Sequence, residues 1–228
     1  MRRVFMTVLL AALPIAASAG GIDVRLGGFF PELNSNLFTD PGDGDFALYD
    51  VQKKDFRGAT GGIEFNMRLV RNVELGFHID GYGRSVDTSY RAYVRDDESE
   101  IRQTLKFDVV PVGVSLRIVP TSRHSRLAPY LAVGVDAVFW HYEEFGDFID
   151  FDDPALPVVA DDFVAEGVAP GAHVAGGVRI PLSHDISLVA EGRYQWAKEK
   201  NIKGDFIGHG DDLDLGGASA TIGVHVRF

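Results

Sequence analysis

Charged side chains occupy alternate positions in several otherwise apolar stretches of the chain. The carboxylates are Asp23, Glu64, Glu74, Asp80, Asp136 and Glu191, the arginines are Arg25, Arg68, Arg117, Arg179, Arg193 and Arg227, and three histidines, His78, His173 and His225, share their face. A buried charge needs a partner, and the planar guanidinium suits a carboxylate in a confined space. If this face is enclosed, the equal numbers of acids and arginines predict a charge network that fills the interior.

The elements that carry these residues have the period of β-strands. Apolar and polar residues alternate, and helical periodicity is nowhere sustained. We expect eight strands, at residues 21–32, 59–70, from 73, 104–119, from 127, 169–181, from 186, and up to 228. In the fourth strand the apolar phase changes between residues 105–109 and residues 112–118. Because proline cannot donate to the ladder, we expect a bulge near Val110 and Pro111, with a lateral opening there as the alternative.

The connections between these strands alternate in length. Those around Arg71, Ser122 and His184 are short, whereas the others are long, polar and rich in glycine or aspartate. This alternation indicates neighbouring antiparallel strands with every long loop at one end. Both termini are then expected at the end that carries the short turns.

The charged face also carries many glycines, and this combination suggests which face points inward. Glycine weakens a solvent-facing strand, but in a narrow barrel it makes room for a long charged neighbour. An eight-stranded barrel has an interior that side chains just fill. The sequence therefore predicts an all-β, eight-stranded antiparallel up-and-down transmembrane β-barrel. The alternative is a soluble barrel with an apolar interior and a solvated charged face.

Aromatic residues lie near both ends of the expected strands. Phe30, Tyr82, Phe139, Trp140, Tyr142, Tyr194 and Trp196 lie near the long loops, and Tyr130 and Phe228 lie near the short turns. Two girdles of this kind are expected where a barrel crosses two membrane interfaces. Ordinary aromatic enrichment in strands is the alternative.

The N-terminus has the pattern of a secretory signal peptide. Arg2 and Arg3 precede the apolar residues 4–16, and residues 17–19 read Ala-Ser-Ala. We expect residues 1–19 to be removed and residues 20–228 to form the barrel. No later stretch is apolar for 18 residues, as a transmembrane helix requires. The absence of cysteine excludes disulfides, and a net charge of −11 argues against nucleic acid as a partner.

Three segments carry a resemblance to a known group of proteins. They are the last strand, residues 220–228, the opening of the fifth strand, residues 129–135, and residues 111–117 of the fourth. These resemble the small outer-membrane β-barrel superfamily, of the OmpA, OmpX and opacity-protein type. The resemblance implies a monomer in the bacterial outer membrane, in contact with lipid and lipopolysaccharide. It also implies that Ile222, Val224, Val226 and Phe228 form the signal recognised by the barrel-assembly machinery.

The sequence contains no convincing catalytic constellation or cofactor motif, so we expect neither an enzyme nor a cofactor or metal. Some barrels of this size resemble lipid A-modifying enzymes, but these need a serine and a histidine on the lipid side, where only His141 is a candidate. The interior histidines are expected to be members of the charge network. The connection at residues 143–166 holds nine acidic residues and no basic one; its residues 150–153 offer carboxylates for a divalent cation, but a solvated loop is the simpler interpretation.

The sequence favours two functions. The first is a non-enzymatic integral outer-membrane protein with a structural role or an interaction role carried by its loops. The second is a narrow conduit for small hydrophobic molecules, as a resemblance to OmpW-type barrels would imply. A lipid A-modifying enzyme is the third and least favoured interpretation.

Overall fold

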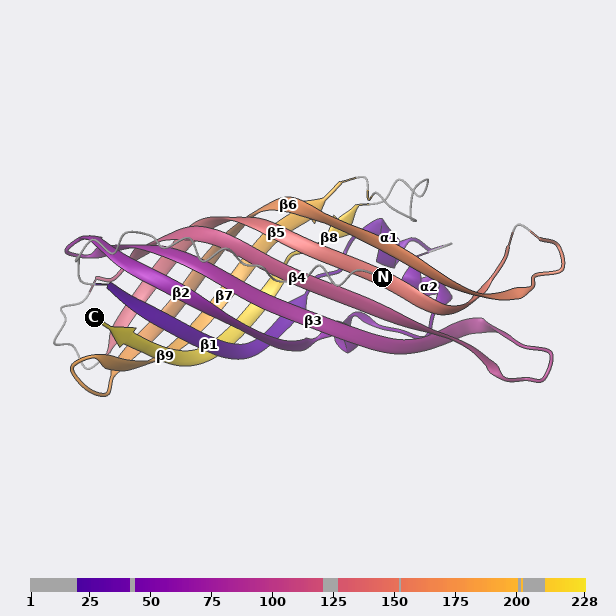
Figure 1. Ribbon diagram of the computed structural model, residues 1–228, viewed down its shortest axis with the longest axis horizontal. Helices are drawn as coiled ribbons and strands as arrows, with labels where there is room; N and C mark the ends of the chain where they lie inside the picture. The colour runs from indigo at the N-terminus through magenta and orange to yellow at the C-terminus, as the bar shows by residue number, and fades with distance from the viewer. Residues whose placement is uncertain (1–19, 42–43, 121–126, 152, 201, 203–211) are drawn as a thin grey trace.

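The computed structural model describes residues 20–41, 44–120, 127–151, 153–200, 202 and 212–228, most of them in strands (Figure 1). The expected short turn around Ser122 and the expected signal peptide lie outside these residues. The strands are β1 (Gly20–Pro31), β2 (Gly58–Val70), β3 (Val73–Val94), β4 (Glu100–Ile118), β5 (Ala128–Ile149), β6 (Val158–Pro181), β7 (Ile186–Glu199), β8 (Leu213–Asp214) and β9 (Gly217–Arg227). The helical pieces are α1 (Asn36–Thr39), α2 (Asp45–Leu48) and the 3₁₀ turn η1 (Lys53–Phe56). None of the described helices is long and apolar enough to cross a membrane.

Eight of the strands close into a ring. Each of β1 to β7 pairs antiparallel with the next, and β9 pairs with both β7 and β1. The two-residue strand β8 adds a short pairing to β7 outside this ring. The predicted eight-stranded antiparallel up-and-down barrel is confirmed. We call the end with the short turns around Arg71 and His184 the lower end of the barrel and the opposite end its upper end; they lie at the left and at the right of Figure 1.

Alternation along the strands places the two kinds of side chain on opposite faces. Charged residues such as Asp23, Arg25 and Glu64 are buried, whereas their neighbours Val24 and Ile63 are exposed. The glycines on the inward face make room for these groups. A Cβ atom at Gly62 would collide with the carboxylate of Asp80.

The expected bulge near Val110 and Pro111 is absent. The pairing of β4 with β5 runs without a shift from Gln103 to Ile118, and the register with β3 is the same on both sides of Pro111. Burial also alternates along the whole of β4 without a break. The change in the apolar pattern therefore reflects a change of environment. Between Val112 and Ile118 the apolar side chains face outward, whereas between Leu105 and Val109 they face inward.

The upper ends of β3 to β6 extend far beyond the other strands as a four-stranded sheet (Figure 1). Here the expected long loop at residues 143–166 is wrong. Most of it is strand, because β5 continues to Ile149 and β6 begins at Val158, and the two pair throughout. Polar residues face outward on this extension, so it has the pattern of a soluble sheet with one buried face.

The first long connection folds onto that buried face. We call its described residues, 32–41 and 44–57, the plug; they include α1, α2 and η1. Leu33, Phe38 and Phe56 of the plug are fully buried, and the Phe38 ring contacts those of Phe107 and Tyr142. A backbone bridge between Tyr49 and Tyr90 and a hydrogen bond from the Asp50 amide to the Ser89 carbonyl, 2.9 Å, attach the plug to β3. The sequence interpretation as a polar loop missed this apolar core at the upper mouth of the barrel.

Candidate functional site

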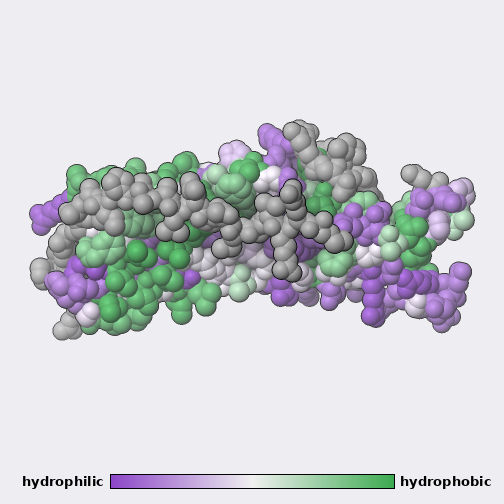
Figure 2. All heavy atoms as spheres, viewed as in Figure 1, coloured by the Kyte–Doolittle hydropathy of each residue, from purple (hydrophilic) through white to green (hydrophobic). Residues whose placement is uncertain are grey.

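Exposed apolar side chains cover the outside of the lower barrel as a belt, part of which is seen at the left of Figure 2. Leu131 is 66 % exposed and Ile222 is 72 % exposed. In water, so much exposed apolar surface in one place would cost a large free energy. On β5 and the residue before it, the outward apolar positions run from Leu127 to Phe139. At about 3.3 Å per residue and a tilt of about 40°, this segment rises about 30 Å, the thickness of the hydrocarbon core. The chain is a transmembrane β-barrel. The soluble-barrel alternative is wrong for this part of the molecule, because the apolar face points outward.

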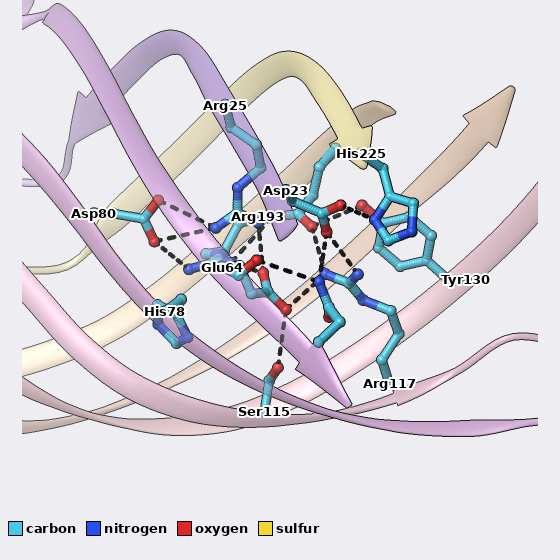
Figure 3. A network of polar contacts seen from close by, with 12 residues as sticks. Asp23, Arg25, Glu64, His78, Asp80, Ser115, Arg117, Tyr130, Arg193 and His225 are labelled. Atoms are coloured by element: carbon cyan, nitrogen blue, oxygen red, sulfur yellow. Dashed lines mark hydrogen bonds and ion pairs between the residues drawn. The ribbon is translucent and has the colours of Figure 1, made fainter. Parts of the chain in front are cut away.

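The lumen inside the belt is filled by ion pairs, shown in Figure 3. Arg117 lies at the centre, with Nη1 2.9 Å from Asp23 and Nη2 2.8 Å from Glu64. Arg25 lies beside it, 2.9 Å from Glu64 and 2.5 Å from Glu191. All of these side chains are at most 2 % exposed, so each charge depends on its neighbours rather than on water.

Further pairs extend this network upward and downward. Above, Arg193 lies 2.7 Å from Asp80 and 3.1 Å from Glu191. Below, Arg179 lies 2.8 Å from Glu74, and the same arginine lies 3.2 Å from Asp23. His225 completes the lower part, with Nδ1 2.5 Å from Asp23. We call these residues, with Arg117, Arg25 and Glu64, the arginine network.

Two expected members lie at its margin or outside it. Arg68 is 22 % exposed and reaches Glu74 only at 4.0 Å. Arg227 lies at the lower mouth, where it donates to the carbonyl of His184 and, among the described residues, forms no ion pair with a carboxylate. The interpretation of Arg227 as part of the lumen network is therefore wrong. It occupies the last inward position of β9, beside the turn whose carbonyl it contacts.

Tyr130 is a member that the sequence interpretation missed. Instead of lying in a girdle, it is buried in the lumen, donates a 2.8 Å hydrogen bond to Glu191, and lies under the Arg117 guanidinium at 4.3 Å. Tyr130 shares the phase of Asp136 on the same strand, and this signal could have placed it inside. Three more of the expected girdle residues also point inward and are buried: Tyr82, Trp140 and Tyr142. Phe30, Phe139, Trp196 and Phe228 do face outward.

A second polar cluster, the histidine triad, consists of His78, Asp136 and His173. His78 Nε2 lies 2.9 Å from Asp136 Oδ1, and His173 Nδ1 lies 2.8 Å from Asp136 Oδ2. All three side chains are at most 1 % exposed. Of the three interior histidines, only His225 therefore joins the arginine network.

Above the belt, the plug and the strands share two buried carboxyl groups. Tyr142 donates a 2.5 Å hydrogen bond to Asp45 of α2, and Tyr49 of the plug donates to Glu144 of β5 at 3.4 Å. Burial is the main cause that raises the pKa of Glu144 from its ordinary 4.5 to about 7. The same burial raises the pKa of Tyr142 well above its usual range. The junction between plug and barrel is thus held by hydrogen bonds around a carboxyl group that favours its neutral form.

Three of the expected assembly residues lie on the outer face of β9, and Phe228 directly follows the strand. Ile222, Val224, Val226 and Phe228 are all exposed, and the Phe228 ring lies against that of Phe65 with centroids 6.1 Å apart. The strand that carries them joins the two ends of the ring.

His141, the one candidate for lipid-side chemistry, lies in an outer groove at the top of the belt. Its Nε2 is 3.2 Å from Glu143 and its Nδ1 is 3.7 Å from Glu166. Phe139, Val168 and Gly167 line this groove, and none of the described residues that line it is a serine.

No family model matches the chain, and no curated protein sequence matches it. Several solved structures align over most of its length. Neisserial surface protein A is 12 % identical, with 92 % of this chain and 97 % of that chain covered and a TM-score of 0.49. The N-terminal β-barrel domain of Pseudomonas aeruginosa OprF is 12 % identical, with 92 % and 98 % covered and a TM-score of 0.43. The E. coli outer membrane protein W is 14 % identical, with 93 % and 100 % covered and a TM-score of 0.41. All three are small outer-membrane β-barrels, and at these identities no residue's role transfers to this chain.

Proposed function

We propose that this protein is a non-enzymatic integral outer-membrane barrel that closes its own lumen and displays a folded β-sheet on the outer side for interaction. The observation that carries this proposal is the inversion along β4. Within the belt the inward side chains form ion pairs, and above it they form an apolar core with the plug. A strand built in this way serves both as a membrane anchor and as part of an external platform.

The filled lumen favours this proposal over the conduit. The arginine network occupies the barrel at the level of the belt, and the plug covers the mouth above it. A cavity of about 30 Å³, room for about two waters, is lined by Arg25, Asp80 and Arg193 of the network and by Tyr82. A lateral exit near Pro111 would require β4 to part from a neighbour. Its pairing with β5 is continuous there, and on the β3 side two pairs are missing opposite Val110 and Pro111 while the register stays the same on both sides.

The extension has features of a preformed interaction surface. Its two hairpin tips are joined by an aromatic cluster of Tyr90, Tyr93 and Phe151 and by an ion pair between Arg95 and Asp147. Tyr93 and Phe151 remain substantially exposed at this distance from the belt. Exposed apolar side chains held on a rigid scaffold are typical of contact surfaces.

Display on the outer side is tested by labelling, which the absence of native cysteine makes simple. Val159→Cys on the extension and Arg71→Cys in the short turn are each expressed in cells and treated with a membrane-impermeant maleimide. We expect labelling of the first variant in intact cells and of the second only after the outer membrane is permeabilised. The reverse pattern would contradict the proposed orientation.

Closure is tested by planar-bilayer recording of the purified wild-type protein, with a sixteen-stranded porin in the same lipid as the positive control. We expect no steady ohmic openings, because an eight-stranded barrel filled by side chains leaves no continuous water path. Large steady openings would overturn the proposal and favour the conduit.

We further propose that residues 1–19 direct export and are then removed. This proposal rests on the sequence, in which an apolar run follows Arg2 and Arg3 and ends at Ala-Ser-Ala, residues 17–19. N-terminal sequencing of membrane-extracted protein should therefore start at Gly20. Retention of Met1 would contradict the export proposal.

A further inference from the structure

The histidine triad differs from the rest of the lumen in its charge partners. Asp23, Glu64, Glu74, Asp80 and Glu191 each lie against at least one arginine. Asp136 is different, because its ion-pair partners in the described part of the chain are the two imidazoles of His78 and His173. A buried carboxylate with no permanent cation beside it is costly, so this position favours an added positive charge.

The atoms of the triad are close together but poorly satisfied by hydrogen bonds. His78 Nε2 and Asp136 Oδ1 lie 2.9 Å apart in a geometry that makes no hydrogen bond. His78 Nδ1 and His173 Nε2 are also buried without a hydrogen-bond partner. Buried polar atoms normally find partners, so a group of unsatisfied atoms at one place points to a missing ligand.

The donor set has the chemistry of a transition-metal site. One ligand atom from each of the three residues lies within 4.8 Å of the others. Two imidazole nitrogens with one carboxylate are common ligands for zinc and similar divalent ions, which take nitrogen at about 2.0–2.1 Å and oxygen at about 2.0–2.2 Å. Two ligand atoms on one tetrahedral ion of this kind lie about 3.3 Å apart, so the contacts of 2.9 Å and 2.8 Å to Asp136 would have to open by about half an ångström to admit it.

The neighbouring backbone is shaped around the triad. A Cβ atom at Gly113 would overlap Asp136 Oδ1 and lie 2.9 Å from His78 Cε1, and one at Gly134 would overlap His173 Cε1. Both glycines are cross-strand partners of triad residues, since Gly113 pairs with His78 and Asp136, and Gly134 pairs with His173. The sequence thus keeps two adjacent inward positions empty so that the three side chains can meet.

We propose that His78, Asp136 and His173 bind one divalent transition-metal ion, of the Zn²⁺ class, inside the barrel. The ion would supply the positive charge that Asp136 lacks and would link β3, β5 and β6 across the lumen. This site is distinct from the arginine network and does not depend on what the extension binds.

The test uses the full mature chain refolded into detergent micelles after unfolding in urea with a chelator. Refolding is carried out without metal, with Zn²⁺, or with Co²⁺, and loosely bound ions are removed by gel filtration. We expect about one retained ion per chain, a visible absorption spectrum with Co²⁺, and higher thermal stability with Zn²⁺ than without metal. X-ray absorption at the zinc edge of the wild type should show scattering from two imidazoles.

Variants locate the site. His173→Gln and Asp136→Asn should each weaken retention at least about tenfold, while the control His184→Gln, whose side chain is 89 % exposed, should retain the ion as the wild type does. No retained metal in folded wild type, or equal retention in both triad variants, would overturn the proposal. If a triad variant fails to fold, the wild-type stoichiometry and the imidazole scattering still decide the question.

Discussion

Arg117 shows why the charges of the lumen depend on one another. It contacts Asp23 and Glu64 directly, lies 3.6 Å from Glu191, and covers the ring of Tyr130. A buried ion pair adds little net stability over good apolar packing, because both charges lose their water. Removing one partner is far more costly, since the other charge then stays buried alone.

We therefore expect Arg117→Ala to lower the free energy of unfolding by about 3–5 kcal/mol. The matched control is Arg68→Ala, at the margin of the network, which should cost less than about 1 kcal/mol because Arg68 is partly solvated and distant from Glu74. Urea unfolding in lipid vesicles, followed by tryptophan fluorescence, measures both values. Equal losses would show that burial does not set the strength of these pairs.

The long strands are single elements with two environments. In β4 the outward residues are apolar from Ile118 to Val110 and polar from Asp108 to Glu100, while the inward residues change in the opposite sense. The membrane selects the first arrangement and water selects the second. The same reasoning explains the plug, whose apolar side chains cover the inward face that the upper strands would otherwise expose.

Glu144, at the junction of β5 and the plug, predicts a pH dependence for this region. Because burial raises its pKa to about 7 from an ordinary 4.5, the folded protein favours the protonated carboxyl group. This contribution to stability is fully present below about pH 4.5 and is lost as the pH rises through about 7, a total change of about 3 kcal/mol. We expect Glu144→Gln, which stays neutral, to lack this loss between about pH 5 and 8. Parallel pH profiles of the unfolding free energy for wild type and variant would contradict the assignment.

On the scale of the whole molecule, the apolar belt divides the barrel from its extension. Val133 in the belt is 58 % exposed, and Val159 on the extension is 43 % exposed. Arginine at position 133 should cost about 2–4 kcal/mol in a bilayer, whereas Val159→Arg should have little effect because its surroundings are water. Unfolding from lipid vesicles measures both variants. A similar cost at the two positions would place the membrane boundary elsewhere.

Assembly of the whole barrel depends on β9, because this strand joins the first and last parts of the ring. We propose that the outward side chains of Ile222, Val224, Val226 and Phe228 are recognised by the barrel-assembly machinery. Deletion of Phe228 should then lower the amount of protein in the outer membrane of cells while leaving refolding into detergent nearly unchanged. Normal membrane levels in cells would count against this role.

The eight strands and the orientation of most of their side chains follow from the sequence alone. A period of two needs no knowledge of neighbours, so the inward phase of Asp23, Arg25 and Glu64 could be read directly, and the same phase applied to Tyr130 would have placed it correctly. The apolar switch in β4 was also visible. A bulge and a change of environment produce the same pattern, however, and only the register with β3 and β5 separates them.

The tertiary structure decided what these elements enclose. The plug has no regular period, and its apolar residues gain partners only where the upper strands of β3 to β6 form a surface for them. Which arginine meets which carboxylate depends on the relative shift of strands around the ring, as does the meeting of His78, Asp136 and His173 from three different strands. Local alternation sets the face of each side chain, whereas its height in the lumen, and therefore its partner, is set by how the ring closes.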